Sequence, residues 1–235
     1  MLNATDMLDE EYAGYFGCQP EDLRAEEVTV LAGGPHPLAI AATSRGGLVS
    51  SNLVGRDRLA AALGGRSGKE LFGQVVLRRL IGILPARDEP WSISEENVLF
   101  YCTVESFRPC VGLSSEPVRP DDAFWQEARE GERDFAEEGR KWHVEAAFAL
   151  YVGSVRVSTA KLIDNGRHHF RAVGVGTDPD YRGRGYAKAC VSAVTAWALG
   201  RDLVPLYNTQ TVNEASVAVA QALGYAEYIW HLDIT

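Results

Sequence analysis

The sequence predicts an α/β fold, a mixed α+β sheet with helices, and three observations carry this prediction. Hydrophobic residues make up 46% of the chain and charged residues 23%, which is the balance of a protein that buries a sizeable core. From about residue 97, apolar segments of strand length and helix length alternate in the order β, α, β, β, β, α, β, α, β. Turn-forming pairs such as Gly153-Ser154 and Asn165-Gly166 separate these segments.

The first part of the chain, residues 1–95, is predicted to be a smaller α/β region. Short apolar runs at 28–31 and 38–42 are expected to be strands, and the glycines beside them indicate a meander or hairpin. Residues 56–63 and 69–84 carry apolar side chains at helical spacing. The break in pattern near residues 85–90 marks the predicted boundary with the second part, residues 96–235.

That second part is predicted to hold most of the sheet. We expect strands at 98–104, 144–152, 155–163, 168–175, 203–207 and 225–232, and helices at 120–140, 185–199 and 213–223.

Charge and cysteine content narrow the classes of function. A formal net charge of −9 repels nucleic acid, so we expect no nucleic-acid partner. No apolar run approaches the ~18 residues of a membrane-spanning helix, and the N-terminus does not resemble a signal peptide, so we expect a cytoplasmic protein without membrane contact. The four cysteines form no CxxC pair and are expected to be reduced structural thiols, with no metal site.

The segment Tyr181-Arg182-Gly183-Arg184-Gly185-Tyr186-Ala187 joins a predicted strand to a predicted helix. Unpaired backbone N–H groups at a helix N-terminus, glycines that allow close approach, and two arginines together suit a pyrophosphate. A tight connection without a ligand remains an alternative reading of the glycines. A dinucleotide fingerprint is disfavoured because Lys188 stands where its third glycine would be, and a Walker loop fails because Glu70 follows Gly68-Lys69.

Three motifs in this part of the chain resemble the GNAT acetyltransferase superfamily. The turn matches Arg/Gln-x-x-Gly-x-Gly/Ala through Arg182, Gly185 and Ala187, and the strand 173–181 before it resembles the family's fourth strand. Downstream, Asn213-Glu214-Ala215-Ser216 and Leu223-Gly224-Tyr225 resemble its C-terminal motifs. The resemblance implies a mostly antiparallel twisted sheet with helices on both faces. It also implies direct N-acetyl transfer from acetyl-CoA to a primary amine, without an acyl-enzyme.

The resemblance also implies which residues would hold acetyl-CoA. Backbone groups of one strand would bond the pantetheine arm, the glycine turn would hold the pyrophosphate, and a downstream asparagine would contact the arm, although it is also a good helix N-cap. The positions are Val173, Val175, Arg182, Arg184, Gly185, Tyr186, Ala187 and Asn213. In the family a bulge opens the slot for the arm, and Gly174 and Gly176 are compatible with one, or with close packing of a neighbouring side chain.

The catalytic residues are harder to assign. The family's usual acid, a tyrosine, is replaced here by Ala220, which leaves Tyr207, Tyr225 or a water to protonate the leaving thiolate. Candidate bases, all ionisable near the predicted strands, are Glu145, His143, His168, His169 and Asp178. Of these we favour Glu145, since partial burial in an apolar run would raise its pKa, together with His168.

The acceptor is expected to be a small-molecule or peptide amine. Residues 116–141 hold nine acidic and five basic residues, a local charge of −4, which fits either a cationic acceptor or a solvated helix face. The N-terminal region would complete the acceptor pocket or form a homodimer surface. The absent tyrosine keeps one alternative function open, a GNAT-like module that senses acyl-CoA without turnover.

Overall fold

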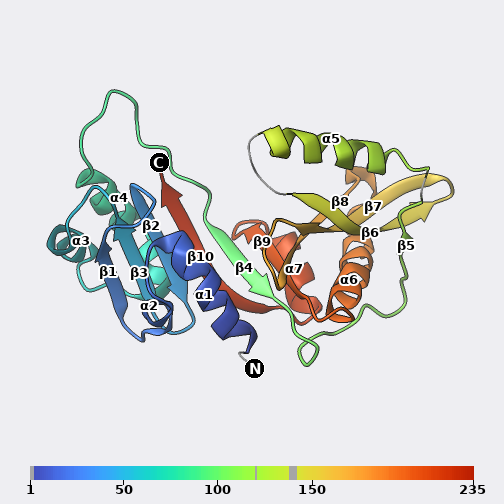
Figure 1. Cartoon of the computed structure of the whole chain (residues 1–235), viewed down its shortest axis with the longest axis horizontal. Helices are drawn as coiled ribbons and strands as arrows, with labels where there is room; N and C mark the ends of the chain where they lie inside the picture. The colour runs from blue at the N-terminus through green and yellow to red at the C-terminus, as the bar shows by residue number, and fades with distance from the viewer. Residues whose placement is uncertain (1–2, 120, 138–141) are drawn as a thin grey trace. The chain divides into compact units, whose positions relative to one another are not determined.

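The computed structural model describes residues 3–119, 121–137 and 142–235, with side chains of α5 described to residue 132. The chain forms two compact units (Figure 1). Unit 1 holds residues up to 99 together with 210–212 and 227–235, and unit 2 holds 100–209 and 213–226.

Unit 1 is a mixed sheet in the order β1-β3-β2-β10, covered by helices. Its strands are β1 (Val28–Ala32), β2 (Leu38–Thr43), β3 (Gly47–Ser51) and β10 (Ala226–Ile234), and β4 (Asn97–Tyr101) leads along the chain into unit 2. Its helices are α1 (Ala4–Phe16), α2 (Pro20–Arg24), α3 (Arg56–Leu63), the 3-10 helix η1 (Gly68–Phe72) and α4 (Gln74–Gly82).

The pairing in unit 1 differs from the predicted meander. β2 pairs antiparallel with β3, a strand that the sequence did not reveal, and β1 pairs with β3 in parallel. The hairpin therefore lies between 38 and 51, with its turn at Arg45-Gly46. Gly47, expected in a turn, is instead a buried residue of β3. A glycine is needed there because a Cβ would lie 2.5 Å from Leu71 Cδ1.

The helix expected at 69–84 is interrupted. Gly73 has extended backbone angles (φ −64°, ψ 139°) and separates η1 from α4, so the two segments are distinct helices. Both still bury their apolar side chains against the sheet, and Leu71 and Leu80 are completely buried. The spacing of apolar residues predicted burial correctly but not the break, because one glycine in an amphipathic pattern is compatible with either.

Unit 2 contains the sheet order β9-β8-β7-β6-β5. Its remaining strands are β5 (Glu116–Pro117), β6 (His143–Val152), β7 (Val155–Asp164), β8 (Phe170–Thr177) and β9 (Val204–Gln210), and its helices are α5 (Phe124–Glu137), the 3-10 helix η2 (Pro179–Tyr181), α6 (Tyr186–Leu199) and α7 (Glu214–Ala222). Pairs from β5 to β8 are antiparallel and β8 pairs with β9 in parallel. The predicted α/β class with a mostly antiparallel sheet is confirmed.

Helices cover both faces of this sheet, as predicted (Figure 1). Phe124 and Ala128 of α5 pack on β6 side chains that include Ala147 and Ala149. On the other face α6 packs against β6, β7 and β8, and its Val191 is completely buried. Because side chains alternate along a strand, each strand presents one row of side chains to each face of the sheet.

Element ends differ from the sequence estimates by a few residues. β4 ends three residues earlier than predicted, at Tyr101, and β9 continues three residues further, to Gln210. Of the helix expected at 120–140, residues 120 and 138–140 lie outside the described residues. Within the described ranges, no helix is both long enough and apolar enough to cross a membrane.

Candidate active site

The two parallel strands β8 and β9 pair over a short stretch and then separate. Their register covers only Phe170, Ala172 and the residue between them, opposite Val204 to Leu206, although both strands continue beyond it. Among the described residues, the edge of β8 from Val173 onward therefore has no strand partner on the β9 side. Backbone N–H and C=O groups along such an edge can bond an extended ligand as a further strand would.

The opening does not arise from a bulge between β7 and β8. Their register runs without a shift from Ile163 opposite Ala172 to Ser158 opposite Thr177. Gly174 instead makes room for a neighbour, because a Cβ there would lie 3.2 Å from Lys161 Cε and 3.3 Å from its Cγ. The close-packing explanation for this glycine is the one that the geometry supports.

The turn after β8 presents backbone amides to the opening. Gly183 and Gly185 have left-handed backbone angles (φ 74° and 80°), which L side chains adopt only at a cost. Gly185 caps α6, and the first helical amide that bonds back is that of Ala189, to Gly185 O at 3.1 Å. The N–H groups of Tyr186 and Ala187 thus have no intrahelical acceptor and lie at the positive end of a 14-residue helix, an arrangement that favours an anion.

A cavity of about 470 Å³ lies between the separated strands, this turn and α7. Its lining includes most of the predicted cofactor residues: Val175, Arg182, Gly185, Tyr186, Ala187 and Asn213. We call it the cofactor cavity. Its polar end at the turn and its apolar side at Val175 and Val219 match a ligand with an anionic head and a less polar arm.

Two of the predicted cofactor residues lie outside the lining. The Val173 side chain is buried in the core, so only its backbone could meet a ligand. The Arg184 guanidinium donates to Asp180 O at 3.1 Å and lies 5.1 Å from the centre of the Tyr181 ring. Arg182 Nε donates to Thr177 O at 3.3 Å, which holds the start of the turn against the end of β8.

Asn213 has a structural role that the sequence also allowed. Its Oδ1 accepts a hydrogen bond from Ser216 N at 3.2 Å, which caps α7. Because Asn213 also lines the cofactor cavity, capping fixes its amide at the cavity wall. The two readings of this residue are compatible.

Tyr207 lies on β9 one residue beyond the last pair with β8, and it lines the cofactor cavity. Its hydroxyl shares a 2.8 Å hydrogen bond with Ser216 Oγ on α7. Ala220, one helical turn further along α7, is completely buried. The phenol of Tyr207 therefore reaches α7 from β9, on the helix from which the family's tyrosine would project.

Burial sets the proton affinity of this phenol. Desolvation raises the pKa of Tyr207, and the hydrogen bond with Ser216 opposes part of the shift. The hydroxyl is thus protonated at neutral pH and can donate a proton. Tyr225, the other tyrosine considered, is buried with its hydroxyl 2.6 Å from Thr195 Oγ1 and does not line the cavity.

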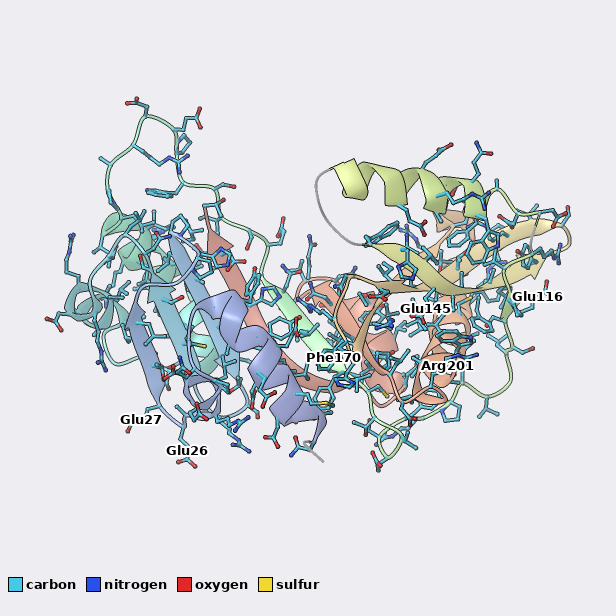
Figure 2. The ribbon with its side chains drawn as sticks, viewed as in Figure 1. Glu26, Glu27, Glu116, Glu145, Phe170 and Arg201 are labelled. Carbon is cyan, nitrogen blue, oxygen red and sulfur yellow. The ribbon has the colours of Figure 1, made fainter. Side chains whose placement is uncertain are left out.

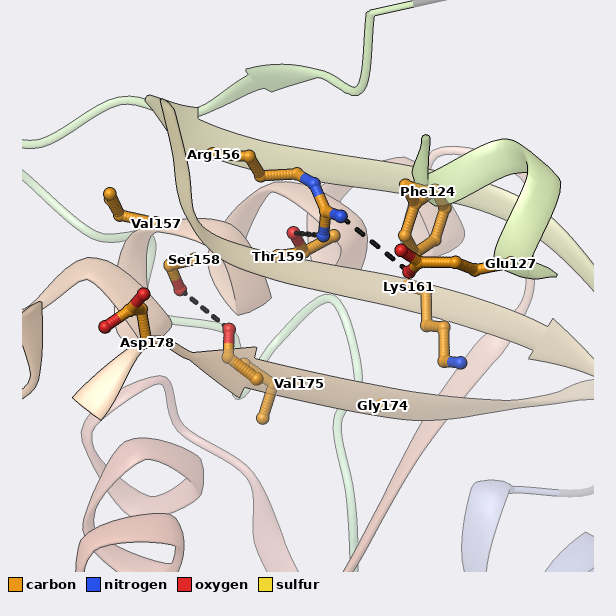
Figure 3. A pocket seen from close by; sticks show the side chains of 11 residues that line it. Phe124, Glu127, Arg156, Val157, Ser158, Thr159, Lys161, Gly174, Val175 and Asp178 are labelled. Carbon is orange, nitrogen blue, oxygen red and sulfur yellow. Dashed lines mark hydrogen bonds and ion pairs between the residues drawn. The ribbon is translucent and has the colours of Figure 1, made fainter. Parts of the chain in front are cut away.

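A second cavity, of about 480 Å³, lies on the α5 face of β7 and β8, and we call it the α5 cavity (Figure 3). Arg156 donates to Asp122 Oδ1 at 3.0 Å and to Thr159 Oγ1 at 2.9 Å, and its Nη2 lies 3.9 Å from Glu127 Oε2. One basic side chain on the wall is thus already neutralised. Lys161 is the other basic side chain, and Figure 3 shows it extending from β7 toward β8.

The two cavities adjoin. Val175 and Gly176 belong to the lining of both cavities. Gly176 has no heavy atom within 4 Å of an added Cβ, so no side chain closes the sheet at this point. Two molecules bound in the two cavities would approach each other at Val175 and Gly176.

Glu145, the favoured base, is held in an ion network on β6 (Figure 2). Arg171 Nε donates to its carboxylate, and the same guanidinium lies 3.4 Å from Asp164 Oδ2. Arg171 is 9% exposed, so Glu145 compensates a buried charge. Glu145 lines neither cavity.

The histidines are also away from the cavities. His168 and His169 stack on each other before β8, with ring centres 5.1 Å apart, and His143 is exposed at the start of β6. Of the five candidate bases, only Asp178 lines a cavity, the α5 cavity. Its Oδ1 accepts a hydrogen bond from Asp180 N at 2.9 Å and so caps η2.

Lys161 and Arg156 are cavity residues that the sequence did not reveal, and Ser216 was identified only as a member of a motif, without its contact to Tyr207. The alternation along 155–163 places Lys161 on the same strand face as Thr159. That signal could not tell which face is open, because the opening depends on where α5 packs. Across the parts of the chain that the structure describes, no three of its His, Cys, Asp and Glu residues are grouped so that they could hold a metal ion.

A family model matches the part of the chain that carries this site. Residues 149–229, which include β8, the turn, α6 and α7, match the GNAT acetyltransferase family model. No curated protein matches the sequence.

Solved structures with a similar fold include three acetyltransferases. A GNAT-family acetyltransferase from Colwellia psychrerythraea is 11% identical with a TM-score of 0.46, covering 61% of this chain and 56% of that one. GCN5-related N-acetyltransferases from Kribbella flavida and Sphaerobacter thermophilus are 17% and 13% identical, with TM-scores of 0.41 and 0.44, covering 61% and 69% of this chain. The chain spans 56 to 59% of the length of these three proteins.

Proposed function

We propose that this chain, a member of the GNAT acetyltransferase superfamily through residues 149–229, transfers an acetyl group from acetyl-CoA to a primary amine. The observation that carries the proposal is the cofactor cavity. It joins an unpaired strand edge, a glycine turn at a helix N-terminus and a capped helix in one wall.

The cavity supports a defined orientation for acetyl-CoA. The pyrophosphate would accept hydrogen bonds from the amides of Gly185, Tyr186 and Ala187, with Arg182 adding positive charge. The pantetheine arm would run back along β8 and bond the backbone of Val173 and Val175. Thr177 lies four residues after Val173 along the strand, a distance of about 13 Å, so the thioester would lie near the point where β8 and β9 separate.

Transfer to an amine requires two proton movements. The attacking amine forms the C–N bond and loses a proton, and the C–S bond breaks to leave a thiolate that gains one. Tyr207, whose protonated hydroxyl faces the cofactor cavity, is the proposed acid for the thiolate. The α5 cavity, which adjoins the thioester end, is the proposed entry for the acceptor.

A binding measurement and a turnover measurement together test the proposal. We expect CoA and acetyl-CoA to raise the melting temperature, and acetyl-CoA with a library of chemically diverse amines to release free thiol. Stabilisation by a nucleotide but not by CoA would refute the cofactor assignment. Binding of acetyl-CoA without thiol release from any amine would instead favour the acyl-CoA-sensing module, for which Ala220 in place of the usual tyrosine is the motivating feature.

A further inference from the structure

A lysine crosses the strand on which the thioester is proposed to lie. Lys161 is on β7 directly opposite Gly174 of β8, and its stem occupies the space that a side chain at 174 would need. A Cβ at position 174 would lie 3.2 Å from Lys161 Cε, so the side chain extends from β7 toward β8 at Gly174 (Figure 3). Gly174 is one residue from Val175, where the two cavities adjoin.

Lys161 differs from the other charged groups around the α5 cavity. Arg156 is paired with Asp122 and lies 3.9 Å from Glu127, and Asp178 caps a backbone amide. Lys161 forms no ion pair within 4.0 Å with any other residue that the structure describes. Its Nζ lies over the Trp142 ring, 5.0 Å from the ring centre.

We propose that Lys161 is the catalytic base, a residue that contacts the acceptor amine in the α5 cavity and removes its proton as it attacks the thioester. This rests on the proposed function. In the step, the acceptor nitrogen forms a bond to the acetyl carbon and the C–S bond of acetyl-CoA breaks. The amine proton passes to neutral Lys161 Nζ, and the thiolate takes a proton from Tyr207. Solvent then removes the proton from Lys161 and returns one to Tyr207.

The surroundings of Lys161 favour a role as a proton acceptor over a role as a positive charge that attracts a ligand. Burial lowers the pKa of Lys161, and the negative charge of Glu127 on α5 opposes part of that shift. A lysine with a lowered pKa is unprotonated in a larger fraction of molecules near neutral pH, which a base must be. Arg156 and Asp178 line the same cavity, and the paired Arg156 adds little net charge.

Kinetics with a defined probe separates a base from a structural lysine. We would measure CoA release from saturating acetyl-CoA with methylamine as acceptor, from about pH 6 to 10, expressed per unprotonated methylamine. The wild type should show one ionisation below that of an ordinary lysine. Lys161→Met should lower the rate at least about 100-fold and remove that ionisation. Lys161→Arg should be equally slow, since a guanidinium keeps its proton.

Controls distinguish the outcomes. Lys69→Met removes a lysine of unit 1 and should leave the rate unchanged, and acetyl-CoA affinity should be the same in all variants. Transfer that survives Lys161→Met within threefold, or full activity in Lys161→Arg, would overturn this proposal alone. A wild type that binds acetyl-CoA and releases no CoA with methylamine would overturn both proposals.

A second measurement needs no acceptor. The chain has four lysines, so selectively carbon-13-labelled lysine side chains can be titrated individually by NMR. Lys161 should titrate at a lower pH than Lys69, and its signal should shift when acetyl-CoA binds. Coincident titration of the two, or a Lys161 signal that acetyl-CoA leaves unchanged, would count against the assignment.

Discussion

Replacing Gly185 with glutamate adds both strain and charge to the proposed pyrophosphate site. Gly185 has φ 80°, and a Cβ there would lie 3.3 Å from Leu113 Cδ1, so the variant is strained by about 1 to 2 kcal/mol. The added carboxylate would stand roughly 4 Å from a bound phosphate, where repulsion between unit charges is about 4 kcal/mol at an effective dielectric constant near 20. That energy corresponds to a loss of CoA affinity of about a thousandfold.

Gly153→Glu is the matched control. Gly153 also has a left-handed φ, 62°, with nothing within 4 Å of an added Cβ, and it lies in the β6–β7 turn outside both cavities. It therefore receives a comparable backbone penalty and the same charge, without the Leu113 contact and without facing the cofactor. Isothermal titration calorimetry should show wild-type CoA affinity for Gly153→Glu and none measurable for a folded Gly185→Glu. Equal affinity in the two variants would refute the assigned turn.

Three further substitutions test the remaining parts of the structure. Tyr207→Phe should lower kcat about 100-fold with little change in acetyl-CoA affinity, because the phenol is lost while its ring stays, and an unchanged kcat would exclude it as the acid. Glu145→Gln should destabilise the protein by about 1 to 2 kcal/mol in urea unfolding, because Arg171 loses its charged partner, whereas a 100-fold slower enzyme of normal stability would identify Glu145 as the base. Burial lowers the pKa of His231 in the folded protein below its ordinary value in the unfolded chain. At a pH between these two pKa values the unfolded chain binds more protons. The stability that neutral His231 contributes is therefore fully present above about pH 6.5 and is lost as the pH falls through the folded-state pKa. His231→Gln should flatten that acid limb in unfolding experiments, and an unaltered limb would contradict the assignment.

Local sequence determined the glycine turn and the helix that follows it. A strand, two glycines and a helix start lie within 20 residues, so the turn at Gly185 and Ala187 could be predicted without knowing any distant contact, and Asn213 could be predicted as the N-cap of the next helix. The start of a helix and its N-cap depend on adjacent residues, and the structure has α6 beginning after Gly185 and Asn213 capping α7. The class of the fold followed in the same way from alternating strand and helix periods.

Tertiary structure decided the rest. The partner of Glu145 is Arg171, 26 residues away in sequence, which also contacts Asp164, and only this pairing shows that the Glu145 carboxylate compensates a buried charge. Lys161 has no motif around it, and its place over Gly174 depends on the register of β7 with β8 and on which face α5 covers. A short segment fixes its own turns and caps through neighbouring residues, whereas a catalytic contact depends on which strands pair and which faces remain open.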